Sequence, residues 1–248
     1  MKIIRSITLG ALVMLAPQFA TAQATQFTIG TNPVGTAFNA VGTALAQVIT
    51  KDTGIRTIAQ PYTGSSVMAP LVSFDELTIG MTTTYGAGRD FNGEDSGQPL
   101  PNLRVLARLW TLPYGYMVTK NSGLETLEQL KGKKVVVDIR GNIALNATNI
   151  ALLGPGGVTV DDVTPVAIAS LPQGVAAVQN GSADATSVGI PIAVVQQANA
   201  TIPGGIKFLS VTGPNATQAF LDSVAPGLSM ITLPAGSMAG VDTDITTM

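Results

Sequence analysis

Residues Phe27–Ile49 read FTIGTNPVGTAFNAVGTALAQVI and join a short β-like run, a glycine-containing loop and an amphipathic segment. From Phe38 to Ile49 the apolar residues recur at spacings of three and four, which is the pattern of one face of an α-helix. The run before Gly30 has the composition of a strand. This stretch therefore predicts a strand that leads through a loop into a helix.

The following residues continue the same order. Asp52-Thr53-Gly54 is expected to stop the helix, and Arg56–Ala59 and Leu77–Met81 are predicted strands. Between them, Thr63–Ser66 supplies helix-capping residues before a short apolar helix. Strands that alternate with helices are typical of a parallel sheet with crossover helices, so the sequence predicts an α/β fold.

A second series of alternating strands and helices occupies residues 121–211. Before it, residues 85–101 read as a loop rich in glycine and acidic residues, and Leu103–Leu109 reads as a strand. Two series predict two lobes. We expect lobe 1 at residues 25–115, with residues 212–248 returning toward it, and lobe 2 at residues 116–211.

The first 24 residues have the features of a secretory signal peptide. Lys2 and Arg5 give a positive start, and the apolar run Ile7–Ala16 is too short to span a bilayer comfortably. Small residues then allow cleavage near Ala22 or Ala24. The sequence therefore predicts export, with a mature protein in the periplasm. An N-terminal membrane anchor is the alternative.

Composition restricts the chemistry. The chain contains no Cys and no His, so the commonest general base, a thiol nucleophile and most transition-metal sites are absent. No Gly-x-Ser-x-Gly or Ser-x-x-Lys motif occurs, and the formal net charge of −2 argues against a nucleic-acid partner. We expect a monomeric protein that is not an enzyme, with no catalytic residue, no cofactor and no metal site.

A two-lobed α/β fold has a natural ligand cleft between its lobes. Ligands bind at the carboxyl ends of parallel strands, where the first N–H groups of helices and the helix dipole favour anions. Loops rich in Gly, Ser, Thr or Asn are expected at that edge. They span residues 30–38, 62–66, 81–85, 138–143 and 187–191.

These loops supply the candidate ligand contacts. In lobe 1 the candidates are Thr31, Val34, Gly35, Thr36, Phe38, Thr63, Gly64, Ser65, Thr82 and Tyr85. In lobe 2 they are Arg140, Asn142 and Ser187. Arg140 is the sharpest candidate, because a guanidinium can hold a carboxylate through two hydrogen bonds. Ordinary turns and helix caps, or a pair between Arg140 and Asp138, are the alternative interpretations.

Three stretches resemble one known family, the TAXI-type receptors of tripartite ATP-independent periplasmic (TRAP) transporters. They are Phe27–Ile49, then Gln60–Ser66 together with Leu77–Thr82, and finally Leu233–Met248. Shorter matches also occur, at residues 102–104, 127–135 and 184–191. The resemblance covers essentially the whole mature chain.

The resemblance implies a periplasmic-binding-protein fold of the type II kind. It also implies that a glutamate-like amino acid or small carboxylate is captured by lobe closure and delivered to TRAP membrane subunits. Family members would continue past Met248 with a strand and further helices, so the C-terminal elements of lobe 1 are expected to be missing. A binding protein of an ABC importer and a periplasmic ligand sensor remain alternatives.

Overall fold

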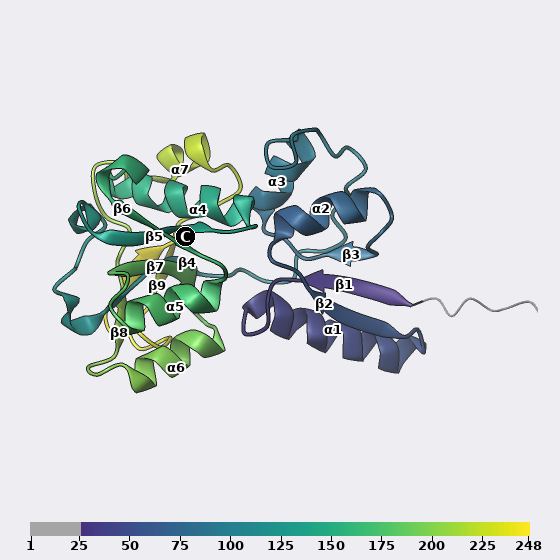
Figure 1. Ribbon diagram of the computed structural model, residues 1–248, viewed down its shortest axis with the longest axis horizontal. Coiled ribbons are helices and arrows are strands. Elements are labelled where there is room, and N and C mark those ends of the chain that lie inside the picture. The colour runs from purple at the N-terminus through teal and green to yellow at the C-terminus, as the bar shows by residue number, and fades with distance from the viewer. Residues whose placement is uncertain (1–25) are drawn as a thin grey trace, which may run out of the picture.

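The computed structural model describes residues 26–248, so the predicted signal peptide lies outside the described residues. These residues form two α/β lobes joined by an extended crossover segment (Figure 1). Lobe 1 is the smaller and lobe 2 the larger. The two lobes contain separate sheets, as the sequence predicts.

Lobe 1 has a parallel sheet of three strands in the order β2-β1-β3. Helix α1 covers one face of this sheet, and α2 and α3 lie on the other (Figure 1). The elements are β1 (Phe27–Thr31), α1 (Ala37–Thr53), β2 (Thr57–Pro61), α2 (Ser65–Ser73), β3 (Ile79–Gly80) and α3 (Thr84–Asn92).

Lobe 2 has a five-stranded sheet in the order β6-β5-β7-β4-β8. Strands β5, β6 and β7 are mutually parallel, whereas β4 runs antiparallel to both of its neighbours. Its elements are β4 (Tyr114–Thr119), β5 (Lys134–Ile139), α4 (Ile143–Leu153), β6 (Thr164–Ile168), α5 (Leu171–Gln179), β7 (Ala185–Gly189), α6 (Ala193–Thr201) and β8 (Ile206–Phe208). Short 3-10 turns lie at Lys120–Ser122, Glu128–Leu130, Gly154–Gly156 and Val160–Asp162.

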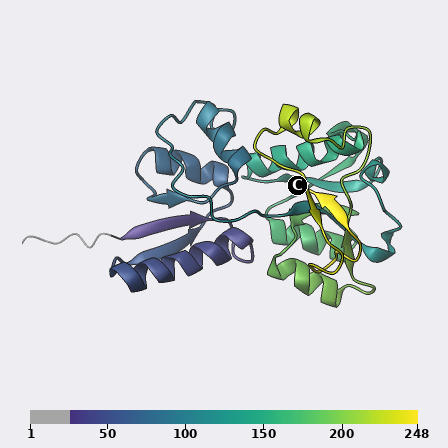
Figure 2. The same ribbon diagram turned by 180° about the vertical axis from the view of Figure 1, so that it is seen from behind.

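The C-terminal segment forms α7 (Gln218–Val224), β9 (Ile231–Leu233) and β10 (Ile245–Thr247). It lies against lobe 2, where the yellow strands β9 and β10 pair with one another (Figure 2). Its last residue, Met248, ends beside the crossover, because the Met248 carbonyl accepts a hydrogen bond of 2.7 Å from the Tyr114 N–H. The return of residues 212–248 toward lobe 1 stays a prediction.

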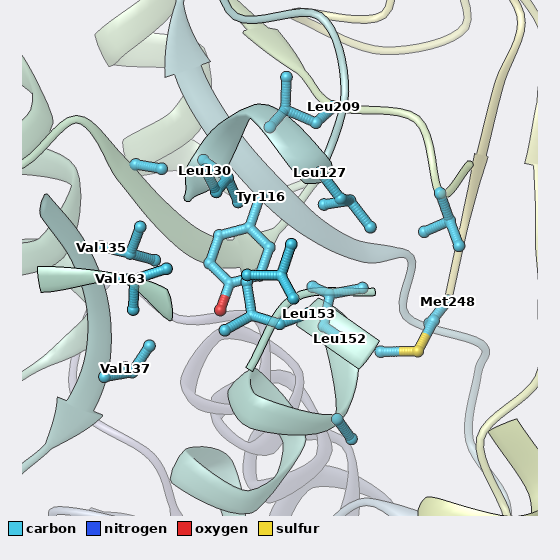
Figure 3. Packing of buried hydrophobic residues seen from close by; sticks show 14 of the residues in the cluster. Tyr116, Leu127, Leu130, Val135, Val137, Leu152, Leu153, Val163, Leu209 and Met248 are labelled. Atoms are coloured by element: carbon cyan, nitrogen blue, oxygen red, sulfur yellow. The ribbon is translucent and has the colours of Figure 1, made fainter. Parts of the chain in front are cut away.

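Two apolar clusters cover the two faces of the lobe 2 sheet. In one of them the buried ring of Tyr116 packs among the aliphatic side chains that Figure 3 labels. Its hydroxyl donates a hydrogen bond of 2.8 Å to the Asn149 carbonyl, so the polar end of this side chain is satisfied inside the core. Lobe 1 has a smaller core around Ile29, Phe38 and Met81.

Two local predictions were wrong. Residues 85–101 do not form one continuous loop, because α3 begins after Thr83, whose side chain caps the helix, and ends at Gly93 in the left-handed conformation. Residues 103–109 form no strand, because no neighbouring strand supplies backbone hydrogen bonds. Val105 and Leu106 there are 84% and 80% exposed.

Candidate functional site: the junction between the lobes

The carboxyl ends of β1, β2 and β3 lie at one edge of the lobe 1 sheet, and α1, α2 and α3 begin there. Thr36 caps α1 by accepting a hydrogen bond of 3.3 Å from the Asn39 N–H, and Thr83 caps α3 with a bond of 3.0 Å from the Gly86 N–H. Helix α2 begins at Gly64, which has no side chain to cap it. The Val67 N–H donates a bond of 3.3 Å to the Gly64 carbonyl, so the N–H groups of Ser65 and Ser66 are the ones left for another acceptor.

Lobe 2 presents a matching edge. The residues after β5 turn into α4, where the Asn142 side chain caps the helix by accepting a bond of 3.1 Å from the Leu145 N–H. Helix α5 begins at Ser170 without a side-chain cap. The N-termini of helices from both lobes thus gather at the junction, where their dipoles favour a negative charge.

The two edges touch at Gly64. A Cβ atom placed on Gly64 would lie only 2.5 Å from Cγ of Asn142, and one placed on Gly141 would lie 3.2 Å from Oγ1 of Thr63. The Ile143 N–H donates a hydrogen bond of 3.3 Å to the Ser66 hydroxyl. The lobes therefore meet through the loop before α2 and the loop before α4, and a glycine allows the close approach.

Several predicted contacts lie at this junction. The distances given above bring together Thr63, Gly64 and Asn142. Ser65 directly follows Gly64 as the first residue of α2. The loop after β1 faces α5, because a Cβ on Gly35 would lie 3.9 Å from Cγ of Pro172.

Three further candidates stand on the same edge of lobe 1. Val34 is 71% exposed, and Thr82 is also exposed. The Thr36 hydroxyl donates to the Pro33 carbonyl at 2.7 Å in addition to capping α1, so the fold already uses it.

Other predicted contacts are packed inside the lobes. The ring of Phe38 is buried and lies edge-on to Trp110, with ring centroids 5.5 Å apart. Thr31 is fully buried and its hydroxyl accepts a bond of 3.0 Å from the Asn39 side chain, which positions α1. Tyr85 is buried against the core cluster of lobe 2 that contains Tyr116.

Ser187 belongs to a buried polar network. Its hydroxyl donates to Oδ1 of Asn149 at 2.6 Å, and the Tyr114 hydroxyl donates to the same oxygen at 2.9 Å. Burial raises the pKa of Tyr114, so its hydroxyl stays protonated and remains a donor. The network ties the start of β4 to β7 and α4, next to the crossover between the lobes.

Arg140 is exposed at the carboxyl end of β5. Within residues 26–248 no ion pair joins it to Asp138, whose carboxylate instead accepts a bond of 3.0 Å from the Asn146 side chain. Its guanidinium is therefore available at the edge of lobe 2 that faces lobe 1.

The sequence interpretation missed Asn149. Ser66 lies within the predicted ligand loop at residues 62–66, although it is not among the individual candidates. Asn149 gives no sequence signal, because nothing in the chain pairs it with residues 35 and 38 positions away, Tyr114 and Ser187.

Two surface hollows lie elsewhere. One of about 460 Å³ is lined by Thr119, Lys133 and Asp184 at the far end of lobe 2, and another lies between α1 and β2. Neither has the convergent helix N-termini of the junction, so we place the candidate site at the junction on chemical grounds.

Two kinds of feature are absent from the residues that the structure describes. Across residues 26–248, no group of three or more acidic, histidine or cysteine side chains is placed to hold a metal ion. None of the helices in the same range combines the length and the apolar character needed to cross a membrane.

Known structures share this architecture. The alkanesulfonate-binding protein SsuA from Xanthomonas axonopodis pv. citri, bound to MOPS, is 19% identical, with a TM-score of 0.50 over 75% of this chain and 60% of that chain. The amino acid ABC transporter substrate-binding protein AbpA from Streptococcus pneumoniae, bound to L-arginine, is 13% identical, with a TM-score of 0.51 over 75% of each chain. PhnD1 from Prochlorococcus marinus, in complex with methylphosphonate, is 14% identical, with a TM-score of 0.52 over 75% of this chain and 72% of that chain.

At these identities the likeness shows the fold alone. It confirms the predicted two-lobed α/β fold of periplasmic solute-binding proteins, and the chain spans about 60% of the length of SsuA. A family model described as the NMT1-like family matches residues 29–248, which is most of the chain. This protein therefore belongs to the NMT1-like family.

Proposed function

We propose that this protein is a periplasmic solute receptor that captures a small carboxylate or amino acid between its lobes. One observation carries the proposal: helix N-termini from both lobes meet at the contact between Gly64 and Asn142. A ligand held beside this contact reaches both lobes at once and stabilises the closed arrangement. The protein acts by binding, and no reaction is part of the proposal.

An anionic group suits this junction for two reasons. The uncapped start of α2 offers backbone N–H donors near Ser65 and Ser66, and the helix dipole adds a favourable field. Arg140 adds an exposed guanidinium at the facing edge. The MOPS and methylphosphonate bound by SsuA and PhnD1 carry anionic groups, and the L-arginine bound by AbpA carries a carboxylate, which supports the same class here.

Ligand contacts are proposed at the positions that reach the junction. They are Val34, Gly35, Thr36, Thr63, Gly64, Ser65, Thr82, Arg140 and Asn142. Thr31, Phe38, Tyr85 and Ser187 are proposed to act indirectly, because their side chains are packed or hydrogen-bonded inside the lobes.

The membrane partner is proposed from the sequence. The resemblance to TAXI-type receptors favours the membrane subunits of a TRAP transporter, with the signal peptide at residues 1–24 directing the protein to the periplasm. A second candidate is the binding subunit of an ABC importer, which the shared fold with AbpA favours. Uptake by reconstituted membrane subunits that needs an ion gradient supports the first candidate, and uptake that needs ATP supports the second.

A thermal-shift screen of the mature protein tests the function. Amino acids and small mono- and dicarboxylates are the probes, and a ligand at 100 times its Kd stabilises the fold by about 2.7 kcal/mol. Arg140→Ala should weaken an acidic ligand by about 1.5–3 kcal/mol, because it removes a charge-assisted hydrogen bond.

Arg56→Ala is the matched control, since Arg56 is exposed near the start of β2, at the opposite edge of the lobe 1 sheet. Equal losses in both variants, or none in either, would remove Arg140 from the site. A cooperative melt that no carboxylate or amino acid shifts would count against the proposed ligand class.

A further inference from the structure

Asn32 is a buried polar residue whose amide oxygen the fold leaves unused. It directly follows the last residue of β1, within the predicted ligand loop at residues 30–38. Its side chain is only 9% exposed, and its amide oxygen has no hydrogen-bond partner among residues 26–248. A buried acceptor without a donor is unfavourable, so this oxygen calls for a donor that the described residues do not supply.

The two faces of β1 show where the Asn32 side chain is directed. Thr31 belongs to the face that α1 covers, because its hydroxyl accepts a bond of 3.0 Å from the Asn39 side chain on that helix. A Cβ placed on Gly30 would lie 2.6 Å from Sδ of Met68 on α2, so Gly30 belongs to the opposite face. Side chains alternate along a strand, which puts position 32 on the face of Gly30. Asn32 is therefore directed toward α2.

Asn32 also lies level with the first turn of α2. This helix runs back from the carboxyl edge of the sheet, since it follows β2 and leads to the parallel strand β3. From Gly30 to Asn32 the strand advances by about 6.6 Å toward that edge. From Met68 back to Ser65 the helix advances by about 4.5 Å in the same direction. The amide oxygen thus lies near the N–H groups of Ser65 and Ser66, which are left for another acceptor.

Backbone hydrogen bonds place the end of β1 at the junction. The Tyr62 N–H donates a bond of 2.8 Å to the Thr31 carbonyl, and the Met81 N–H donates one of 3.0 Å to the Gly30 carbonyl. The loops that follow β2 and β3 therefore flank the end of β1. The loop after β2 is the one that touches lobe 2.

Free donors and a free acceptor side by side suit a ligand group that carries both an acceptor and a donor. A carboxylate accepts from the N–H groups of Ser65 and Ser66, and a substituent on the neighbouring carbon then lies beside the Asn32 oxygen. An ammonium there makes a charge-assisted hydrogen bond, which is stronger than the bond of a neutral hydroxyl.

We propose that Asn32 selects α-amino acids over unsubstituted carboxylates by accepting a hydrogen bond from the α-ammonium group. This inference rests on the proposed capture of a carboxylate at the junction. It narrows the ligand class to amino acids and assigns the α-amino group to lobe 1.

Matched ligands and matched variants test the inference. The common L-amino acids are screened by thermal shift, and the one with the largest shift is titrated by calorimetry. It is compared with the α-hydroxy acid and the unsubstituted acid of the same carbon skeleton, such as L-lactate and propionate for L-alanine. The proteins are the wild type, Asn32→Ala and the control Asn92→Ala, because Asn92 is exposed at the far end of α3.

We expect the wild type to bind the amino acid most tightly and the unsubstituted acid least. Asn32→Ala should weaken the amino acid by about 10- to 150-fold, since a charge-assisted bond is lost, and should change the unsubstituted acid little. Asn92→Ala should keep the preference of the wild type. Because Asn32→Ala removes a buried acceptor that has no partner, its Tm without ligand should be at least that of the wild type.

Three results would overturn the role of Asn32 and leave the proposed function standing. They are a wild type that binds the unsubstituted acid as tightly as the amino acid, a hydroxy acid that binds more tightly than both, and an Asn32→Ala protein that keeps the preference. A wild type that binds no carboxylate, with or without an amino group, would contradict the proposed function itself.

Discussion

Replacing Gly64 with Ala tests whether the junction closes on a ligand. The added Cβ would lie 2.5 Å from Cγ and 2.7 Å from Cβ of Asn142, about 1 Å inside an ordinary carbon–carbon contact. The backbone at Gly64 is extended, with φ of −172°, so alanine adds no backbone strain there. The clash therefore acts only on the approach of the two lobes.

The cost of this overlap sets the expected loss of affinity. Overpacking a close contact costs about 1–3 kcal/mol, and opening of the lobes relieves it. Because ligand binding requires the closed arrangement, the apparent Kd should rise about 5- to 150-fold. The free energy of unfolding should change much less, since the added Cβ does not overlap Asn142 when the lobes are open.

Calorimetric titration with the best ligand from the screen measures the Kd, and urea unfolding measures stability. Gly88→Ala is the matched control, because a Cβ on this α3 glycine meets no atom within 4 Å. In an Asn142→Gly background, which lacks the clashing atoms and keeps an acceptable helix cap, Gly64→Ala should cost much less affinity than it does in the wild type. A Gly64→Ala protein that binds as tightly as the wild type would refute closure through this contact.

Three further predictions concern stability. Phe38→Ala should lower the free energy of unfolding by about 3–5 kcal/mol, because the ring packs on Trp110 inside lobe 1. Phe38→Leu should keep ligand affinity, and a large rise in its Kd would instead make Phe38 a ligand contact. Tyr116→Phe should cost about 1 kcal/mol in urea unfolding through loss of the 2.8 Å bond to the Asn149 carbonyl, and an unchanged midpoint would contradict this. The Thr159 N–H and hydroxyl lower the pKa of Asp162, so this carboxylate should stabilise the fold above pH 4 and lose that effect as the pH falls further. Asp162→Asn should therefore reduce the acid sensitivity of unfolding. Identical pH profiles for the variant and the wild type would contradict this prediction.

Local sequence patterns were sufficient where neighbours in the chain make the structure. The apolar face of Phe38–Ile49 and the cap at Thr36 lie within one helix, so α1 could be predicted closely. The same holds for the loops before α2 and α4, which the sequence places at strand ends, although α2 begins at Gly64 without the side-chain cap that the sequence predicts. Helix α3 was missed because its sequence contains two glycines and few apolar residues, and its burial depends on contact with lobe 2.

Candidate residues were harder to predict than elements. A loop at a strand end indicates which residues are near the site, but the direction of each side chain depends on packing. Phe38 turns into the core and Ser187 turns toward Asn149, and neither direction can be read from the alternation of strands and helices.

The sequence by itself determined the two α/β lobes and the edge at which their helices begin, because periodicity and capping are local properties. It also determined that the loops at this edge are rich in Gly, Ser, Thr or Asn, as is typical of loops that bind anions. Only the tertiary structure decided that Gly64 meets Asn142, that the Asn32 amide oxygen is buried without a partner among the described residues and that residues 103–109 find no neighbouring strand. Those outcomes depend on segments distant in the chain being packed together, and contacts of that kind leave no signal in local spacing.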